Sequence, residues 1–184
     1  MGKNGEKDAI PSRCGENSKG KTLNEKQMFI TEGTFSSSMD SGGRFQLPAA
    51  LREVSATVEG RFVMNMGMEQ CITLYPMDEW LVYRQQLGSL NVFRPDQRAL
   101  VRYFLSSATE VRVDAKNRLL VPKHLAQYAA LDKEVLLVGM LHFLEIWNPD
   151  QYRQNMLQIP AKESAAVYEL AEKIHAGWQK GGGE

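Results

Sequence analysis

The stretch VRVDAKNRLLVPKHL, residues 111–125, places a polar centre between two aliphatic runs. Asp114 and Asn117 are residue types that favour tight turns, so a turn is predicted between a strand before Asp114 and a second strand over Leu119 to Val121. Pro122 suits the start of a helix, because the N–H that proline lacks has no partner at that position anyway. The stretch therefore predicts strand, turn, strand and helix start.

Nearly the same layout occurs earlier, in SSSMDSGGRFQLPAALR, residues 36–52. Four of its residues have counterparts 74 positions later: Asp40, Gly43, Arg44 and Pro48 correspond to Asp114, Asn117, Arg118 and Pro122. A second block, MGMEQCITLYPMDEW (66–80), aligns at an offset of 72 with VGMLHFLEIWNPDQY (138–152). Matches in the same order indicate a tandem duplication, whose period of about 73 residues is longer than that of most solenoid repeats.

Each copy is predicted to contain two strands joined by a turn, a short helix and two further strands, over residues 34–79 and 108–151. A unit of about 45 residues is too small to close a core by itself. We therefore expect an α+β protein in which both copies contribute strands to one β-barrel with pseudo-two-fold symmetry. Helical spacing in the connector, residues 80–107, and in residues 152–184 predicts flanking helices.

The ends of the chain are predicted to lie outside this barrel. Residues 1–27 are rich in Gly, Lys, Asn, Glu and Ser and nearly free of large apolar side chains, which is typical of a disordered leader. Met28, followed by Phe29, is a candidate for the original start. At the other end, an apolar helical stripe is expected to consist of Val167, Leu170, Ala171, Ile174 and Trp178.

Composition places the chain among globular proteins. The 184 residues are 43% hydrophobic and 24% charged, with a formal net charge of zero. Bulk charge therefore neither supports nor excludes a nucleic-acid partner. The two cysteines, Cys14 and Cys71, match no metal-ligand or redox spacing and favour a reducing cytoplasm. No apolar run approaches the roughly 18 residues of a membrane span, and no signal peptide is indicated.

Two residues are not explained by turn geometry. An Asp accepts a backbone hydrogen bond within a turn, and Gly or Asn tolerates positive φ there, but no tight turn needs the guanidinium groups of Arg44 and Arg118. One interpretation is that each Arg pairs with the Asp of its own copy or of the other, and so braces the barrel. The other is that the two arginines face an anionic partner, through phosphate contacts or guanine readout. Both can hold at once.

Basic residues gather near the second turn, where Arg112, Lys116, Arg118 and Lys123 exceed Glu110 and Asp114 by two. The candidate DNA-contacting residues are therefore Arg44, Arg112, Lys116, Arg118 and Lys123. Arg94, Arg98 and Arg102 recur every four residues along the connector, a pattern that is most typical of a solvated helix face.

Catalysis is not indicated. His124, His142 and His175 have no metal spacing, and no serine or cysteine lies in a nucleophile motif. An enzyme that uses Asp114, His124 or His142 at the barrel mouth is the weakest hypothesis. We expect no cofactor, no metal and no small-molecule substrate.

The motifs DSGGRFQLP (40–48), CITLYPMDEW (71–80), RALVRYFLSSATE (98–110), DAKNRLLVP (114–122) and LDKEVLLVGMLHFLEIW (131–147) carry a resemblance. From about Met28 to Tyr152 the sequence resembles the MraZ family of bacterial transcriptional regulators, which are built from two tandem SpoVT-AbrB-type domains. The resemblance implies a swapped-hairpin β-barrel, a homo-oligomeric ring, and binding to short direct repeats in double-stranded promoter DNA. It also implies a cytoplasmic, nucleoid-associated protein that regulates the division and cell-wall gene cluster containing its own gene.

In this family an Asp-x-x-Gly-Arg motif lines the DNA-facing side. The motif matches Asp40, Gly43 and Arg44 in the first copy, and Asp114, Asn117 and Arg118 in the second. Gly42 stands where the family often has Lys, whereas Lys116 supplies a basic group at the equivalent place, so the first copy is expected to hold DNA more weakly. The alternative is a ring-forming scaffold or antitoxin-like interaction protein whose arginines only brace the fold.

Overall fold

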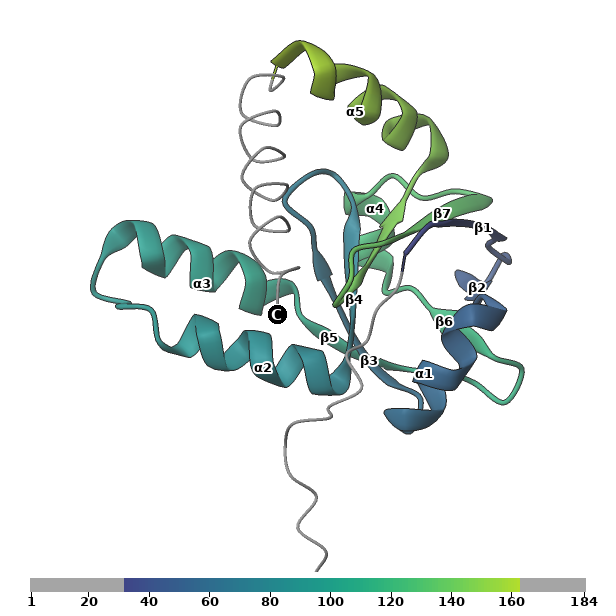
Figure 1. The fold of residues 1–184 in the computed structure, drawn as a ribbon, viewed down its shortest axis with the longest axis horizontal. Helices are drawn as coiled ribbons and strands as arrows, with labels where there is room; N and C mark the ends of the chain where they lie inside the picture. The colour runs from purple at the N-terminus through teal and green to yellow at the C-terminus, as the bar shows by residue number, and fades with distance from the viewer. Residues whose placement is uncertain (1–31, 163–184) are drawn as a thin grey trace, which may run out of the picture.

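The computed structural model describes residues 32–162, which form an α+β fold with one large antiparallel sheet (Figure 1). The first copy contains β1 (Thr34–Ser38), β2 (Arg44–Gln46), η1 (Ala49–Leu51), α1 (Arg52–Thr57), β3 (Arg61–Met66) and β4 (Ile72–Pro76). The second copy contains β5 (Thr109–Arg112), β6 (Arg118–Leu120), α4 (Lys123–Tyr128), β7 (Glu134–Gly139) and β8 (Leu144–Trp147). The flanking helices are α2 (Met77–Gly88), α3 (Pro95–Ser107) and α5 (Pro149–Lys162).

The two copies exchange their first strands. The large sheet has the order β1-β7-β8-β4-β3-β5, so β1 of the first copy pairs with β7 of the second, and β5 of the second pairs with β3 of the first. Swapping the copies reverses this order onto itself, which is the pseudo-two-fold symmetry expected from the duplication. The remaining strands, β2 and β6, form a separate two-stranded ribbon.

The two-stranded ribbon is attached to the main core through buried side chains. At its centre Phe45 of β2 is paired with Leu119 of β6, and both side chains are completely buried. Their neighbours Gln46 and Leu120 are exposed, because successive residues of a strand point to opposite faces. The ribbon is thus anchored to the core by one face and presents the other to solvent.

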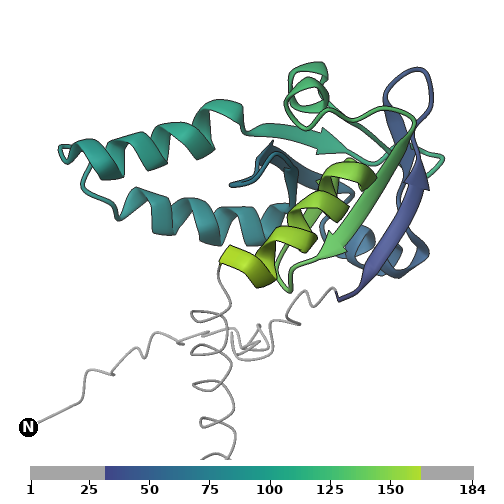
Figure 2. The same ribbon diagram turned by 90° about the horizontal axis from the view of Figure 1, so that it is seen from above.

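A second, aromatic core lies between the sheet and the helical connector. Tyr75 stacks on Phe143 and Tyr83, with ring centroids 4.9 and 5.3 Å apart, and Trp80 packs beside them. Helices α2 and α3 run alongside each other as an arm that extends away from the sheet (Figure 2). Tyr75 and Trp80 therefore pack the connector against the sheet.

Two helices differ slightly in detail from the simplest sequence pattern. Pro122 occupies the position just before the first residue of α4, and α4 ends at Tyr128. Leu100 of α3 is 39% exposed, because it lies one turn closer to the arm's tip than the buried Phe104.

The predicted leader, residues 1–27, and the stripe from Val167 to Trp178 lie outside the described residues. Within residues 32–162, no helix combines the length and the apolar character needed to cross a membrane.

Candidate nucleic-acid interface

The two turns that precede β2 and β6 have the same hydrogen bonds. In the first, Asp40 Oδ1 accepts from the backbone N–H groups of Gly42 and Arg44 at 2.9 and 3.0 Å. In the second, Asp114 Oδ1 accepts from those of Lys116 and Arg118 at 2.8 and 2.9 Å. Each Asp side chain thus stabilises its own turn through hydrogen bonds from the turn's backbone N–H groups.

The fourth turn position, three residues after each Asp, needs left-handed backbone in both copies. Gly43 has φ +78° and Asn117 has φ +56°. In this region Gly has no steric penalty, and Asn is among the best-tolerated side chains. The N–H of Gly43 donates to Asp40 O, and that of Asn117 donates to Asp114 O, both at 2.9 Å. This shared geometry explains the residue choice at positions 43 and 117.

The β2–β6 ribbon brings the two turns side by side. Beyond the strands, Leu47 N–H donates to Asn117 O and Val121 N–H donates to Gly43 O, both at 2.9 Å. Gln46 Nε2 donates to the carbonyl of Lys116 at 3.0 Å. The turn of each copy is therefore held by the strand of the other.

Arg118 joins the two aspartates. Its Nε and Nη2 contact Asp114 Oδ2 at 3.0 and 2.8 Å, and its Nη1 donates to Asp40 Oδ2 at 3.0 Å. The side chain of Arg118 is 30% exposed. Arg118 thus pairs with the Asp of its own copy and also with the Asp of the other copy, which are the two pairings that the bracing interpretation allowed.

Arg44 differs from its counterpart. Among residues 32–162 no carboxylate lies within ion-pair distance of its guanidinium, although Arg44 is near enough to Asp40 to lower the pKa of that carboxyl. A Cβ built at Gly42 would lie 2.9 Å from Arg44 Nη1, so a side chain there would displace the guanidinium. The missing side chain at position 42 gives Arg44 the space beside its turn.

The aspartates of both turns are ionised at neutral pH. The pKa of Asp40 is lowered mainly by the backbone N–H of Arg44, and further by that of Gly42 and by the charge of Arg118. The pKa of Asp114 is lowered mainly by the backbone N–H of Arg118, and then by its guanidinium. Both carboxylates are therefore negatively charged where they contact the Arg118 guanidinium.

The other basic candidates lie around this centre. Lys116 is exposed within the second turn, and Lys123 is exposed at the start of α4. Arg112, whose side chain is 66% exposed, ends β5 and contacts Glu110 at 3.4 Å. In the described part of the chain, no hydrogen bond or ion pair connects Arg112 or Lys123 to the two turns.

One basic residue near this surface was not predicted. Arg61, at the start of β3, forms a two-point contact with Glu110, at 3.0 and 3.4 Å, and thereby joins the ion pair of Arg112. The contact spans two strands that are far apart in sequence, so only the pairing of β3 with β5 would have revealed it.

The residues of the enzyme hypothesis are not gathered. No hydrogen bond or ion pair within residues 32–162 links Asp114 with His124 or His142. His142 instead contacts Glu79, with 3.4 Å between Nδ1 and Oε2.

Two copies of one unit, joined through paired Asp–Arg turns, define a tandem-repeat protein with an α+β fold. Comparison with known proteins agrees: the family model described as "MraZ protein, putative antitoxin-like" matches residues 30–103 and again residues 104–170. The chain belongs to the MraZ family.

Relatives named transcriptional regulator MraZ match most of the chain. The protein of Desulforamulus reducens is 41% identical over 143 residues, which is 77% of this chain and 95% of that protein. The one from Alkaliphilus metalliredigens is 39% identical over 127 residues, 69% of this chain and 85% of the relative. That of Thermomicrobium roseum is 35% identical over 147 residues, 80% of this chain and all 100% of the relative.

Proposed function

We propose that this protein is a sequence-specific DNA-binding transcriptional regulator, and that the two adjacent turns of the β2–β6 ribbon contact the DNA. The supporting observation is the pairing itself: Arg44, Lys116 and Arg118 lie on two joined turns at the solvent side of one ribbon. The names of the relatives point to the same role.

The two arginines would act differently. A guanidinium has about five N–H donors, and Arg118 uses three of its own on Asp40 and Asp114. Its remaining donors have a fixed direction, which suits readout of a guanine edge. Arg44, without an ion pair among the described residues, can turn toward a phosphate.

Lys116, Arg112 and Lys123 would add phosphate contacts around this centre, since all three are exposed. Phosphate contacts fix the position of a protein on the duplex without reading sequence. Arg61 and Glu110 would hold Arg112 in place rather than contact the DNA themselves.

The larger assembly completes the proposal. We propose that the sheet and the ribbon form a swapped-hairpin barrel, and that several copies assemble into a ring. A chain of zero net charge offers one weakly basic surface, but a ring that presents several such surfaces to short direct repeats gains avidity without new contacts. The target would be the promoter of the division and cell-wall cluster, reached in the cytoplasm at the nucleoid.

The test is a titration of the DNA upstream of the gene at several salt concentrations, followed by fluorescence anisotropy. Arg44→Ala should weaken binding and reduce the slope of log K against log salt by about 0.9 for each protomer engaged. Arg102→Ala removes the same charge from an exposed position of α3 that has no ion pair among the described residues, so it should leave the slope unchanged. Equal slopes for the parent and Arg44→Ala would reject this role for Arg44.

Arg118→Ala should reduce affinity for the upstream promoter more than Arg94→Ala does. Arg94 is exposed and pairs only with Asp96 among the described residues, at 3.1 Å, so its loss controls for a missing guanidinium. If promoter affinity is unchanged in Arg118→Ala, the turns do not contact DNA through this residue.

Two observations favour the alternative, a scaffold or antitoxin-like interaction protein. Arg118 already satisfies two carboxylates, and the arm exposes apolar side chains, with Phe93 88% and Leu81 51% exposed. Gel shifts separate the two functions. A scaffold should bind the upstream fragment and a shuffled fragment of equal length alike at moderate salt, whereas a regulator should prefer the upstream fragment.

A further inference from the structure

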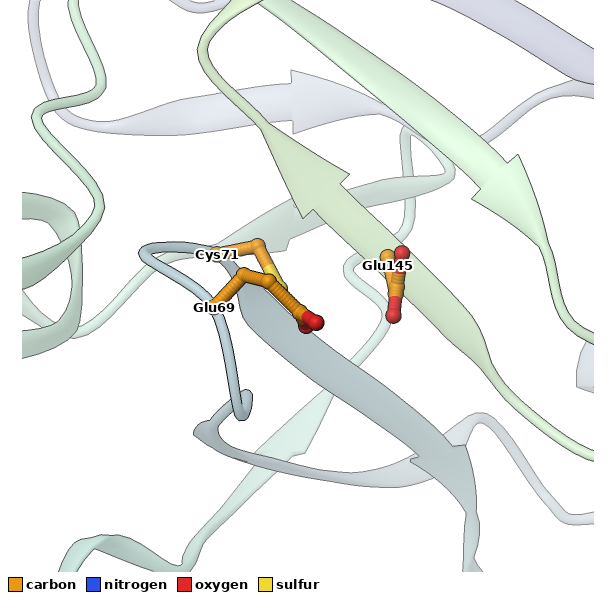
Figure 3. Close-up of side chains that lie close together, drawn as sticks. All are labelled: Glu69, Cys71 and Glu145. Carbon is orange, nitrogen blue, oxygen red and sulfur yellow. The ribbon is translucent and has the colours of Figure 1, made fainter. Parts of the chain in front are cut away.

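A second cluster of ionisable groups lies away from the turns, beside the loop that joins β3 to β4. It consists of Glu69 and Cys71 from that loop and Glu145 from β8, whose side chains lie close together in Figure 3. One carboxylate oxygen of each glutamate and the Sγ of Cys71 all lie within 4.8 Å of one another.

The cluster concentrates groups that can carry negative charge, without a basic partner. In the described part of the chain, neither Glu69 nor Glu145 forms an ion pair. The Cys71 thiol has 0% exposure, and no side chain within residues 32–162 forms a hydrogen bond with it. Burial raises the pKa of this thiol, and the charges of Glu145 and Glu69 raise it further, against a weaker effect of the Glu69 backbone.

The surrounding structure holds the groups in place. Trp147 Nε1 donates to Glu145 Oε2 at 2.9 Å, which fixes one carboxylate oxygen. Tyr128 Oη lies 3.0 and 2.9 Å from the carbonyl oxygens of Gly67 and Glu69, which share its single O–H donor, and this contact fixes the loop. Hydrogen bonds of this kind commonly orient the residues that bind a metal.

The duplication provides an internal comparison. In the alignment of the second block of each copy, Glu69 and Cys71 correspond to Leu141 and Phe143, and Glu145 corresponds to Thr73. Phe143 belongs to the aromatic core, where it stacks on Tyr75. The fold therefore accepts apolar residues at two of the three places and an uncharged residue at the third, so folding alone does not account for a thiol between two carboxylates.

We propose that Glu69, Cys71 and Glu145 bind one divalent transition-metal ion, with Zn²⁺ as the best fit. A thiolate favours zinc over the harder cations Mg²⁺ and Ca²⁺, while zinc also accepts carboxylate oxygens. Atoms bound to one tetrahedral ion lie about 3.5 Å apart, so the exposed side chain of Glu69 moves inward on binding. Three protein ligands leave a fourth position for water.

Binding of the ion is coupled to loss of a proton. Zinc binds sulfur as a thiolate, so the proton of the Cys71 thiol passes to solvent as the sulfur binds.

The experiment uses the full chain, reduced and freed of metal with a chelator. Titration with Zn²⁺ should give one ion per chain, and Co²⁺ should produce a thiolate-to-cobalt charge-transfer band. Cys71→Ser should abolish the band, whereas Cys14→Ser should retain it. Loss of the band in Cys14→Ser but not in Cys71→Ser would overturn the assignment.

Variants of the carboxylates are a second test, because Cys71→Ser changes a buried side chain and a loss of the band from misfolding must be distinguished from a loss of the ligand. Glu69→Gln changes an exposed side chain and should weaken Zn²⁺ binding by at least about tenfold. Glu134→Gln, an exposed glutamate of β7, is the matched control and should bind like the parent. Parent-like affinity in Glu69→Gln, or far less than one ion per parent chain, would reject the site.

Discussion

Truncating Leu119 to Ala should destabilise the protein strongly, because this side chain anchors the ribbon that carries both turns. Leu119 has 0% exposure and faces Phe45, which is also completely buried. The substitution removes three carbon groups at about 0.8 kcal/mol each, or roughly 2.4 kcal/mol, and the cavity that remains adds to this. We expect a loss of about 3 kcal/mol in the free energy of unfolding.

Leu120→Ala is the matched control, since it makes the same chemical change one residue further along β6. Leu120 is 44% exposed because it points to the opposite face. Its truncation should therefore cost less than about 1 kcal/mol. Urea unfolding can be followed by the fluorescence of Trp80 and Trp147, both of which are buried. Protomer concentration must be equal throughout, because oligomerisation would shift the apparent stability.

One result would contradict this expectation. Equal destabilisation by Leu119→Ala and Leu120→Ala would show that the ribbon is not anchored by one face. A double variant adds a second check: Leu119→Ala and Phe45→Ala remove the same contact, so their costs should not add, with a coupling of about 0.5–3 kcal/mol.

Three further outcomes are expected. Gly42→Lys restores the charge that Lys116 supplies in the second copy and should tighten DNA binding by several-fold in anisotropy titrations; weaker binding would indicate that displacement of Arg44 dominates. The carboxylate of Asp114 has a pKa below its ordinary 3.8, so its stabilisation is complete above that pH and is lost as the pH falls through the lower, folded-state value. Acid unfolding monitored by circular dichroism should therefore be less steep for Asp114→Asn, whereas the exposed Asp132→Asn should behave like the parent. Asn117→Gly should be tolerated, because the backbone of this residue has φ +56°. Asn117→Val should cost about 1–2 kcal/mol in urea unfolding, and equal stabilities would contradict the backbone argument.

The internal repeat made much of the fold predictable. The two matched blocks placed equivalent strands and turns in both copies, and the residue types of the turns gave their backbone conformation. The exchange of β1 and β5 was not predictable in detail, because alternation along β1 says which face is buried but not which strand lies beside it. That choice depends on contacts with the other copy, far along the chain.

The candidate sites, like the fold, were predictable from the sequence only in part. The sequence left open whether Arg44 and Arg118 pair with carboxylates, and the structure gives different answers for the two. Arg118 reaches both aspartates, whereas Arg44 occupies the space beside Gly42. The cluster around Cys71 was missed because Glu145 approaches it only through the pairing of β4 with β8, which leaves no trace in linear spacing.

The exchange of first strands has a consequence for synthesis on the ribosome. Thr34 of β1 is paired with Val138, so this early strand emerges long before its neighbour exists. At about 5–20 residues per second, the wait for that neighbour is roughly 5–20 s. During this interval the nascent first copy exposes an unpaired edge that a chaperone, or the same segment of an adjacent polysome product, can occupy.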